Sequence, residues 1–236
     1  YDVALLDIDA ATLAATAADL AQPDRVLALT CDVSDPAAVD DAARSVMARW
    51  GRVDALVNNA GVAVFKPAME PSFAEWRRVL GTNLDGAFLC SQAFGAIMVA
   101  QRSGAIVNVA SISGLRASTL RVAYGTSKAA LIHLTKQYAV ELGNYGVRVN
   151  CICPGPVETG MAKLVHDVAV RTDYYDAIPL GRYGTVEEMA KVIGFLCGPE
   201  ASFVNGQALA NDGGFDASGV GIPTFRRTAG LNAVGV

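Results

Sequence analysis

Hydrophobic and polar positions in the first part of the chain follow two alternating periods. Short apolar runs at 3–7, 25–33 and 53–61 have the length and the Val, Leu and Ala content of buried strands. Between them, the residues up to about 20 and the residues at 36–50 repeat their apolar positions at helical spacing. This order of strand, helix and strand predicts parallel strands that are covered by helices on both faces.

The same alternation continues through the second part of the chain. Two helical stretches are expected within 72–101, with Gly81 between them, and a long amphipathic helix is expected at 123–142. A further helix at 185–197 opens with the capping-box pattern of a threonine followed three residues later by a glutamate. The remaining expected strands lie at 104–111, 146–153 and 206–210.

These elements predict an α/β fold with a doubly wound Rossmann-type parallel sheet. The 236 residues contain no internal repeat and no linker-like segment, so we expect a single domain. This domain is predicted to span residues 1–214. Residues 215–236 are rich in Gly and Ala and weakly patterned, and we assign them to a C-terminal tail without predicted secondary structure.

Composition and charge exclude several classes of function. Apolar residues make up 52% of the chain, but charged or polar residues interrupt every apolar stretch before the roughly 18 residues that span a bilayer. The net charge of -4 comes from interspersed acids and bases that form no basic face. We therefore expect a soluble, cytoplasmic protein that binds neither nucleic acid nor membrane.

The cysteines and histidines do not predict a metal site. The five cysteines form a scattered, odd set without a C-x-x-C pair, and His133 and His166 lie apart from one another. This pattern argues against zinc and against a disulfide framework, and it favours a reducing compartment. Cys151 and Cys153 lie two residues apart in an expected strand, so they share one face and are interpreted as small buried hydrophobic residues.

The first candidate for chemistry is a tyrosine and lysine pair. Tyr124 and Lys128 are four residues apart in the expected helix, so their side chains share one face. A nearby ammonium lowers the pKa of a tyrosine, and such a pair can act as a general acid/base. The spacing alone is weak because Y-x-x-x-K also occurs on solvent-facing helices. Ser111 strengthens this interpretation, because it ends the preceding expected strand. Open parallel sheets bind their ligands at the carboxyl ends of the strands.

Together with further motifs, these residues give the chain a resemblance to the short-chain dehydrogenase/reductase family, from residue 1 to about 214. Each motif is weak by itself, but their order and spacing are jointly specific. The matching features are Asp7 after a strand, CDV with Asp32 and Val33, NNAG at 58–61, Asn83, Ser111, Tyr124 with Lys128, and PGPVET at 154–159.

The resemblance implies hydride transfer between C4 of a nicotinamide and a secondary alcohol or ketone carbon. In this reading Tyr124 is the general acid/base and Ser111 holds the substrate oxygen by a hydrogen bond. Lys128 binds the nicotinamide ribose and lowers the pKa of Tyr124. Asn83 keeps a water in the proton relay behind the lysine.

The resemblance also predicts NAD as the cofactor. Asp7 would accept hydrogen bonds from the adenosine ribose hydroxyls and repel a 2′-phosphate, and no Lys or Arg precedes Arg25. The alternative role for acids at this point is helix N-capping, which suits Asp9 but not Asp7. The other implied contacts are Asp32 and Val33 at the adenine, Asn58 and Ala60 at the ribose, Val157 and Thr159 at the carboxamide, together with Pro154, Tyr124 and Lys128.

The sequence gives only weak indications of the substrate. Arg116 and Arg121 lie between Ser111 and Tyr124 and can favour an anionic substrate, although exposed loop arginines are common. By resemblance, residues 160–181 form the variable substrate lid. His166 is interpreted as a lid residue and His133 as structural.

The chain departs from the family pattern at its start, because the first strand, its T-G-x-x-x-G-x-G loop and the first helix have no counterpart here. In the family's sheet that strand lies between the strands at 3–7 and 53–57. We favour an NAD-dependent dehydrogenase whose natural chain has further residues before Tyr1. The alternative is a catalytically inactive paralogue used for interaction. By resemblance we also expect a homo-oligomer, a tetramer or a dimer, that packs helices 84–101 and 123–142 across two-fold axes.

Overall fold

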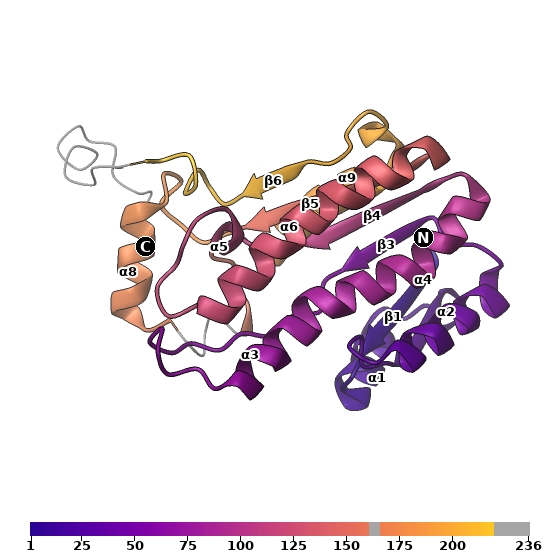
Figure 1. The fold of residues 1–236 in the computed structure, drawn as a ribbon, viewed down its shortest axis with the longest axis horizontal. Coiled ribbons are helices and arrows are strands. Elements are labelled where there is room, and N and C mark those ends of the chain that lie inside the picture. Colours follow the sequence, from indigo (N-terminus) through magenta and orange to yellow (C-terminus); the bar gives the residue numbers. More distant parts are fainter. Residues whose placement is uncertain (161–165, 220–236) are drawn as a thin grey trace.

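The computed structural model describes residues 1–160 and 166–219 and contains two parallel sheets. One sheet pairs β1 (Val3–Asp7) with β2 (Val26–Thr30). The other has the strand order β3 (Ala55–Asn58), β4 (Gly104–Val109), β5 (Val147–Pro154) and β6 (Ala208–Asn211). The arrowheads of these four strands lie at the side of the molecule that carries α8 (Figure 1). The predicted α/β architecture with six parallel strands is confirmed.

Helices connect the strands in the predicted order. The α-helices are α1 (Ala10–Asp19), α2 (Pro36–Trp50), α3 (Phe73–Leu80), α4 (Gly86–Gln101), α5 (Ile112–Leu115), α6 (Val122–Leu142), α8 (Val168–Ala177) and α9 (Val186–Cys197). Short 3-10 turns lie at η1 (Pro23–Arg25), η3 (Gly143–Tyr145) and η4 (Pro199–Ala201).

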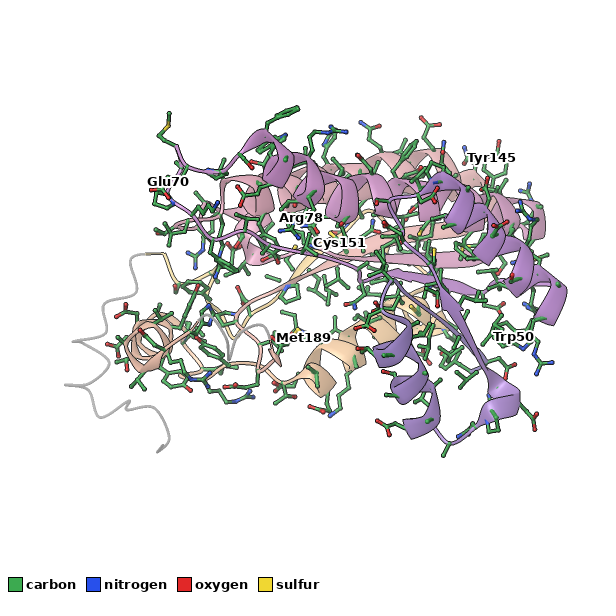
Figure 2. All side chains as sticks on the ribbon, turned by 90° about the horizontal axis from the view of Figure 1, so that it is seen from below. Trp50, Glu70, Arg78, Tyr145, Cys151 and Met189 are labelled. Carbon is green, nitrogen blue, oxygen red and sulfur yellow. The ribbon has the colours of Figure 1, made fainter. Side chains whose placement is uncertain are left out.

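Side chains of the larger sheet alternate between two helical layers. Ile106 packs in the core cluster that contains residues of α2 and α4, whereas Val107 and Ile152 pack against α9. Figure 2 shows the two layers: Arg78 of α3 and Met189 of α9 lie on opposite sides of the sheet. Both faces of the sheet are therefore covered, as a doubly wound fold requires.

The two cysteines of β5 confirm the predicted facing. Cys151 and Cys153 are both fully buried and pack with Leu131 and Ile132 of α6. Neither forms a disulfide. They are small apolar residues of the core, as the sequence indicated.

The two sheets are separated at one position, between β1 and β3. Within the described residues these two strands pair with no common neighbour, so each has one unpaired edge. Val3 and Val57 are 36% and 39% exposed at these strands. The sheet is interrupted where the resemblance places a further strand. Side chains of β1 and β2 nevertheless share a core cluster with those of α2 and α4, which connects the two sheets by packing.

The two helical stretches expected on either side of Gly81 are present as α3 and α4, and Gly81 begins the turn between them. Gly81 has a right-handed helical conformation, and the chain runs from α3 into α4 through a π-helical turn, η2 (Gly81–Asp85). A glycine weakens a helix by about 1 kcal/mol but does not end it when tertiary packing holds the turn. Val33 packs against Gly86 so closely that a Cβ on this glycine would lie 2.7 Å from it, which fixes the position of this turn. The π turn is where Asn83 enters the interior.

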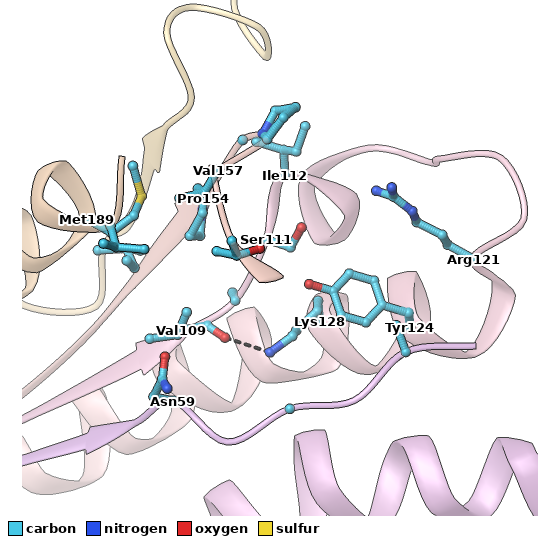
Figure 3. Close-up of a pocket in the computed structure, with 18 of the residues that line it drawn as sticks. Asn59, Val109, Ser111, Ile112, Arg121, Tyr124, Lys128, Pro154, Val157 and Met189 are labelled. Carbon is cyan, nitrogen blue, oxygen red and sulfur yellow. Dashed lines mark hydrogen bonds between the residues drawn. The ribbon is translucent and has the colours of Figure 1, made fainter. Parts of the chain in front are cut away.

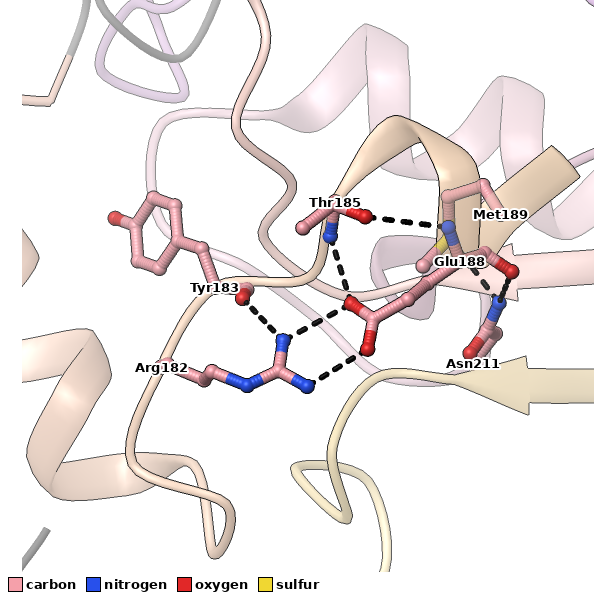
Figure 4. Close-up of polar contacts among 6 residues, drawn as sticks. All are labelled: Arg182, Tyr183, Thr185, Glu188, Met189 and Asn211. Atoms are coloured by element: carbon pink, nitrogen blue, oxygen red, sulfur yellow. Dashed lines mark hydrogen bonds and ion pairs between the residues drawn. The ribbon is translucent and has the colours of Figure 1, made fainter. Parts of the chain in front are cut away.

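Helix α9 begins at the predicted capping box. Thr185 Oγ1 accepts from the Glu188 backbone N–H at 3.2 Å, and the Glu188 carboxylate accepts from the Thr185 backbone N–H at 2.8 Å. Arg182 holds both carboxylate oxygens of Glu188, at 2.7 and 2.9 Å (Figure 4). These contacts fix the start of the helix whose next turn carries Met189.

Candidate active site

A cavity of about 590 Å³ lies at the carboxyl ends of β3, β4 and β5. Residues of α5, α6 and α9 complete its wall, so segments from most of the chain meet at one place (Figure 3). The lining residues in the described chain include the basic side chains Arg121 and Lys128 and no acidic one. The predicted convergence of polar motifs at one crevice is confirmed for Ser111, Tyr124, Lys128, Pro154, Val157 and Thr159.

Ser111 lies two residues after the end of β4 and is buried in the cavity wall. Its extended backbone makes it the N-cap of α5, where its Oγ accepts from the Ser113 backbone N–H at 3.1 Å. Its neighbour Gly114 allows α5 to lie against α6, because a Cβ there would come within 2.7 Å of the Lys128 carbonyl carbon. The capping bond and this close contact hold the Ser111 hydroxyl in the cavity.

Tyr124 and Lys128 occupy one face of α6, as their spacing predicts. The Lys128 Nζ lies 5.7 Å from the centre of the Tyr124 ring and donates to the Val109 carbonyl oxygen at 2.6 Å. The side chain of Lys128 is buried, and burial lowers its pKa from 10.5 to about 8. The lysine is therefore tied to the end of β4 beneath the tyrosine (Figure 3).

The predicted decrease in the pKa of Tyr124 is wrong for this structure. Burial raises the pKa of the phenol above its ordinary value of 10, because the low-dielectric surroundings disfavour the phenolate. A hydrogen bond with Ser111 and the charge of Arg121 act in the opposite direction. Burial raises the pKa of Tyr124, and the cation that lowers it is Arg121, three residues earlier in the chain.

Asn83 lies behind the lysine rather than in the cavity wall. Its Oδ1 accepts from the Val62 backbone N–H at 2.8 Å, and its Nδ2 donates to the Val62 carbonyl oxygen and the Ser127 hydroxyl, both at 3.0 Å. A Cβ added to Gly61 would lie 3.4 Å from Asn83 Oδ1 and 3.5 Å from Lys128 Nζ. These are ordinary contact distances, so Gly61 lies directly against both groups.

The residues predicted for the adenosine half lie at the ends of β1 and β2, outside the cavity. Asp7 is exposed at the end of β1, and its carboxylate accepts from the Asp9 backbone N–H at 2.9 Å. Asp9 caps α1, as expected. Asp32 follows β2 and accepts from Ser34, while Val33 packs against the core.

The NNAG motif divides its residues between the core and the cavity. Asn58 donates to Asn108 Oδ1 at 2.8 Å and to the Ser91 hydroxyl at 3.1 Å, so its side chain points into the interior. Ala60 is exposed. Asn59, which the sequence reasoning did not select, lines the cavity beside Gly61.

Other cavity residues were also missed by sequence reasoning. Phe65 lies in a loop without a motif, and Ile112 follows Ser111 in the short helix α5, which was not expected. From α9, the apolar residues Val186, Met189, Ala190 and Ile193 line the cavity. Their spacing is that of a helix face, which a sequence pattern cannot distinguish from core packing.

The two candidate substrate arginines have different surroundings. Arg116 donates to the Phe215 carbonyl oxygen, stacks on the Phe215 ring at 4.0 Å and lies 3.9 Å from Asp216. Arg121 lines the cavity instead. Among the predicted lid residues, His166 lies at the cavity, and residues 161–165 of this segment lie outside the described residues. His133 is exposed and contacts Gln137 at 3.1 Å.

The described residues hold neither a metal-site candidate nor a helix that could span a membrane. In residues 1–160 and 166–219, no group of His, Cys, Asp and Glu side chains has an arrangement that suits a metal ion. No helix in the described part of the chain is both long and apolar enough to cross a bilayer.

Comparisons with known proteins agree with this geometry. Residues 1–216 match the family profile described as enoyl-(acyl carrier protein) reductase. Meso-2,3-butanediol dehydrogenase of Serratia marcescens is 39% identical over 194 residues, which are 82% of this chain and 76% of that protein.

Two solved structures illustrate the similarity of fold. A gluconate 5-dehydrogenase from Burkholderia cenocepacia, in complex with NADP and tartrate, has a TM-score of 0.86 and 31% identity, and the match covers 92% of this chain and 86% of that one. A NAD+-bound xylitol dehydrogenase has a TM-score of 0.83 and 33% identity, and the match covers 89% and 87%.

Proposed function

Because this chain belongs to the short-chain dehydrogenase/reductase family, we propose that it transfers hydride between NAD(H) and a secondary alcohol or ketone, with Tyr124 as the general acid/base. The observation that carries this proposal is the position of Ser111 and Tyr124 in one cavity, with Lys128 buried beneath them. Polyols, simple secondary alcohols, hydroxysteroids and hydroxyacyl thioesters all fit these three residues.

The proposed proton transfer uses the hydroxyl groups of the cavity. Ser111 holds the substrate oxygen by a hydrogen bond, which places this oxygen beside the Tyr124 hydroxyl. In ketone reduction Tyr124 gives its proton to the oxygen, and in alcohol oxidation it takes the hydroxyl proton. The base in alcohol oxidation is the phenolate form of Tyr124, the form that burial disfavours.

The residues around the cavity fit a nicotinamide dinucleotide, which would supply the hydride acceptor or donor when bound. Val157 and Thr159, which line the cavity, would contact the carboxamide, and Lys128 would bond the nicotinamide ribose. Asn83 would hold a water behind Lys128. Pro154 ends β5 at the same wall. Asp32 and Val33 would flank the adenine, and Asn58 and Ala60 would line the ribose side.

NAD is the cofactor that we propose, on the basis of Asp7. Its carboxylate is exposed at the end of β1 and forms no ion pair within the residues that the structure describes. A carboxylate at this point accepts from ribose hydroxyls and repels a 2′-phosphate. Similar structures hold either cofactor, NADP in the gluconate dehydrogenase and NAD+ in the xylitol dehydrogenase, so this choice depends on local residues.

The acid/base assignment is tested with Tyr124→Phe in the full-length protein. NAD reduction is measured with a panel of secondary alcohols and hydroxy acids. We expect kcat to fall by about 10²- to 10⁴-fold, the usual contribution of a positioned acid/base. Tyr145→Phe is the matched control, because Tyr145 lies in η3 and does not line the cavity.

Circular dichroism and thermal unfolding of both variants establish that the fold is kept. Turnover of Tyr124→Phe at the level of the wild type would show that another group carries the proton.

A further inference from the structure

Arg121 lies at the start of the helix that carries Tyr124 and extends into the same cavity. It is the N-cap residue of α6, and its side chain is partly buried. Its guanidinium carbon lies 5.1 Å from the centre of the Phe65 ring. Its side-chain nitrogens lie 3.3 Å from the Ser113 hydroxyl, 3.3 Å from the Tyr174 hydroxyl and 3.5 Å from His166 Nε2.

The hydrogen bonds between these partners and the guanidinium of Arg121 are weak. The group has five N–H donors in a planar fork that matches the two oxygens of a carboxylate. Its three polar contacts are at the long end of the hydrogen-bond range. The contacts hold the fork in place and leave donors that a ligand can use.

Neighbouring arginines show the pairing that Arg121 lacks. Arg116, Arg171 and Arg182 contact carboxylates, and their partners are Asp216, Glu158 and Glu188. Arg121 has no such partner in the described chain, and the segments 161–165 and 220–236 contain no Asp or Glu. The positive charge of Arg121 therefore meets no side-chain carboxylate.

The cavity itself favours a negative charge near Arg121. Its described lining contains Arg121, Lys128 and His166 and no acidic side chain. The second basic group, Lys128, is already bound to the Val109 carbonyl oxygen. An anion in this cavity would thus meet the guanidinium of Arg121 as its nearest unpaired cation.

Arg121 and Tyr124 both line the cavity, at the start of the same helix. A substrate whose oxygen is held at Tyr124 can therefore place an anionic group at the guanidinium of Arg121. A hydroxy acid has both groups, whereas a neutral acyl chain has no group for the fork.

We propose that Arg121, positioned by Tyr174 and His166, binds an anionic group of the substrate, so that the protein acts on hydroxy acids. This inference rests on the proposed function, since it names the substrate class of the same site. Arg121 is then the residue that selects the substrate.

The test compares two substrates that differ only in charge, 3-hydroxybutyrate and methyl 3-hydroxybutyrate. The measured quantity is the ratio of their kcat/KM values with NAD in the full-length protein. We expect the wild type to prefer the anion, and Arg121→Gln to lower the ratio by about 10- to 100-fold, as the loss of a charge-assisted bond predicts. Arg121→Lys should give an intermediate ratio, because it keeps the charge and loses the fork.

Arg116→Gln is the matched control, because Arg116 is held by Phe215 and Asp216. Its ratio should equal that of the wild type. A third substrate, a hydroxyalkyl sulfonate of the same chain length, shows which anionic group the fork prefers. If the ratio of the two kcat/KM values were the same in the wild type and in Arg121→Gln, the inference would be overturned. The proposed dehydrogenase function would not be affected by this result.

Direct binding separates this outcome from failure of the proposed function. Titration calorimetry with acetoacetate and methyl acetoacetate measures the charge preference without turnover. If neither alcohol is oxidised, the proposed function fails for this substrate size. The inference still stands if acetoacetate binds more tightly than its ester and Arg121→Gln removes the difference, and it falls if the ester binds as well as the anion.

Discussion

Replacement of Lys128 by methionine is expected to stabilise the protein at neutral pH. Lys128 is only 4% exposed, and burial lowers its pKa from 10.5 to about 8. A shift of one pKa unit corresponds to about 1.4 kcal/mol, so the buried ammonium destabilises the native state by about 3 kcal/mol relative to a neutral amine. Methionine fills similar space and carries no charge.

The substitution also removes a favourable contact. Lys128 Nζ donates to the Val109 carbonyl oxygen at 2.6 Å, and a buried carbonyl left without a partner costs about 1–3 kcal/mol. The net gain for Lys128→Met at pH 7 is therefore about 0–2 kcal/mol. Activity should be lost in the same variant, which would make Lys128 a residue kept for function at the expense of stability.

The stability difference between Lys128→Met and the wild type should also depend on pH, and this pH dependence tests the argument better than the size of the difference at pH 7. Below pH 8 the lysine is charged in both native and unfolded states, so the native state has the full penalty. Between about pH 8 and 10.5 the native lysine is neutral while the unfolded lysine still binds a proton, so the stability of the wild type increases with pH. Lys128→Met should then lose its advantage by pH 10 and become the less stable protein.

Urea unfolding at pH 7 and pH 10, without cofactor, measures this effect. The difference in unfolding free energy between variant and wild type should change by about 2–3 kcal/mol between the two pH values. Lys136→Met is the control, because Lys136 is exposed on the same helix and its ammonium is hydrated in both states. A difference for Lys128→Met that is the same at both pH values would refute the reasoning.

Two further substitutions test the cofactor assignment and the start of α9. Asp7→Ala should raise the ratio of kcat/KM for NADP over NAD by about tenfold or more, since it removes a charge that would repel the 2′-phosphate; an unchanged ratio would show that Asp7 does not face the ribose. Thr185→Ala should lower the free energy of unfolding by about 1 kcal/mol through loss of the capping bond to Glu188, whereas Thr185→Ser should keep it. Urea unfolding checks this pair, and equal stabilities would show that the cap contributes nothing.

Much of the site was predictable from sequence, because parallel strands bring their carboxyl ends to one edge of a sheet. Ser111 follows β4, and Pro154 is the last residue of β5. Ser111 and Pro154 are far apart along the chain, but the sheet topology predicts that they lie close together in space. The spacing of Tyr124 and Lys128 placed both on one helix face for the same reason, that the helical period is fixed.

Other features depend on contacts that no local pattern encodes. Asn58 donates into the core to Asn108, a residue 50 positions away. Arg116 donates to Phe215, which is 99 positions away. This contact keeps Arg116 out of the cavity that Arg121 lines. The direction of the Tyr124 pKa shift follows from burial, which depends on how several elements pack around the phenol.

The interruption between β1 and β3 has a consequence for how the native state opens. Backbone hydrogen bonds hold β1 to β2 and β3 to β4, but in the described chain none joins the two sheets. In the described residues, β1 and β2 are held to the rest of the molecule by the core cluster that they share with α2 and α4, so exchange of their amide hydrogens reports on this packing. A strand that pairs with both free edges would merge the two sheets into one cooperative unit. The stability of the cavity's frame would then depend on that pairing.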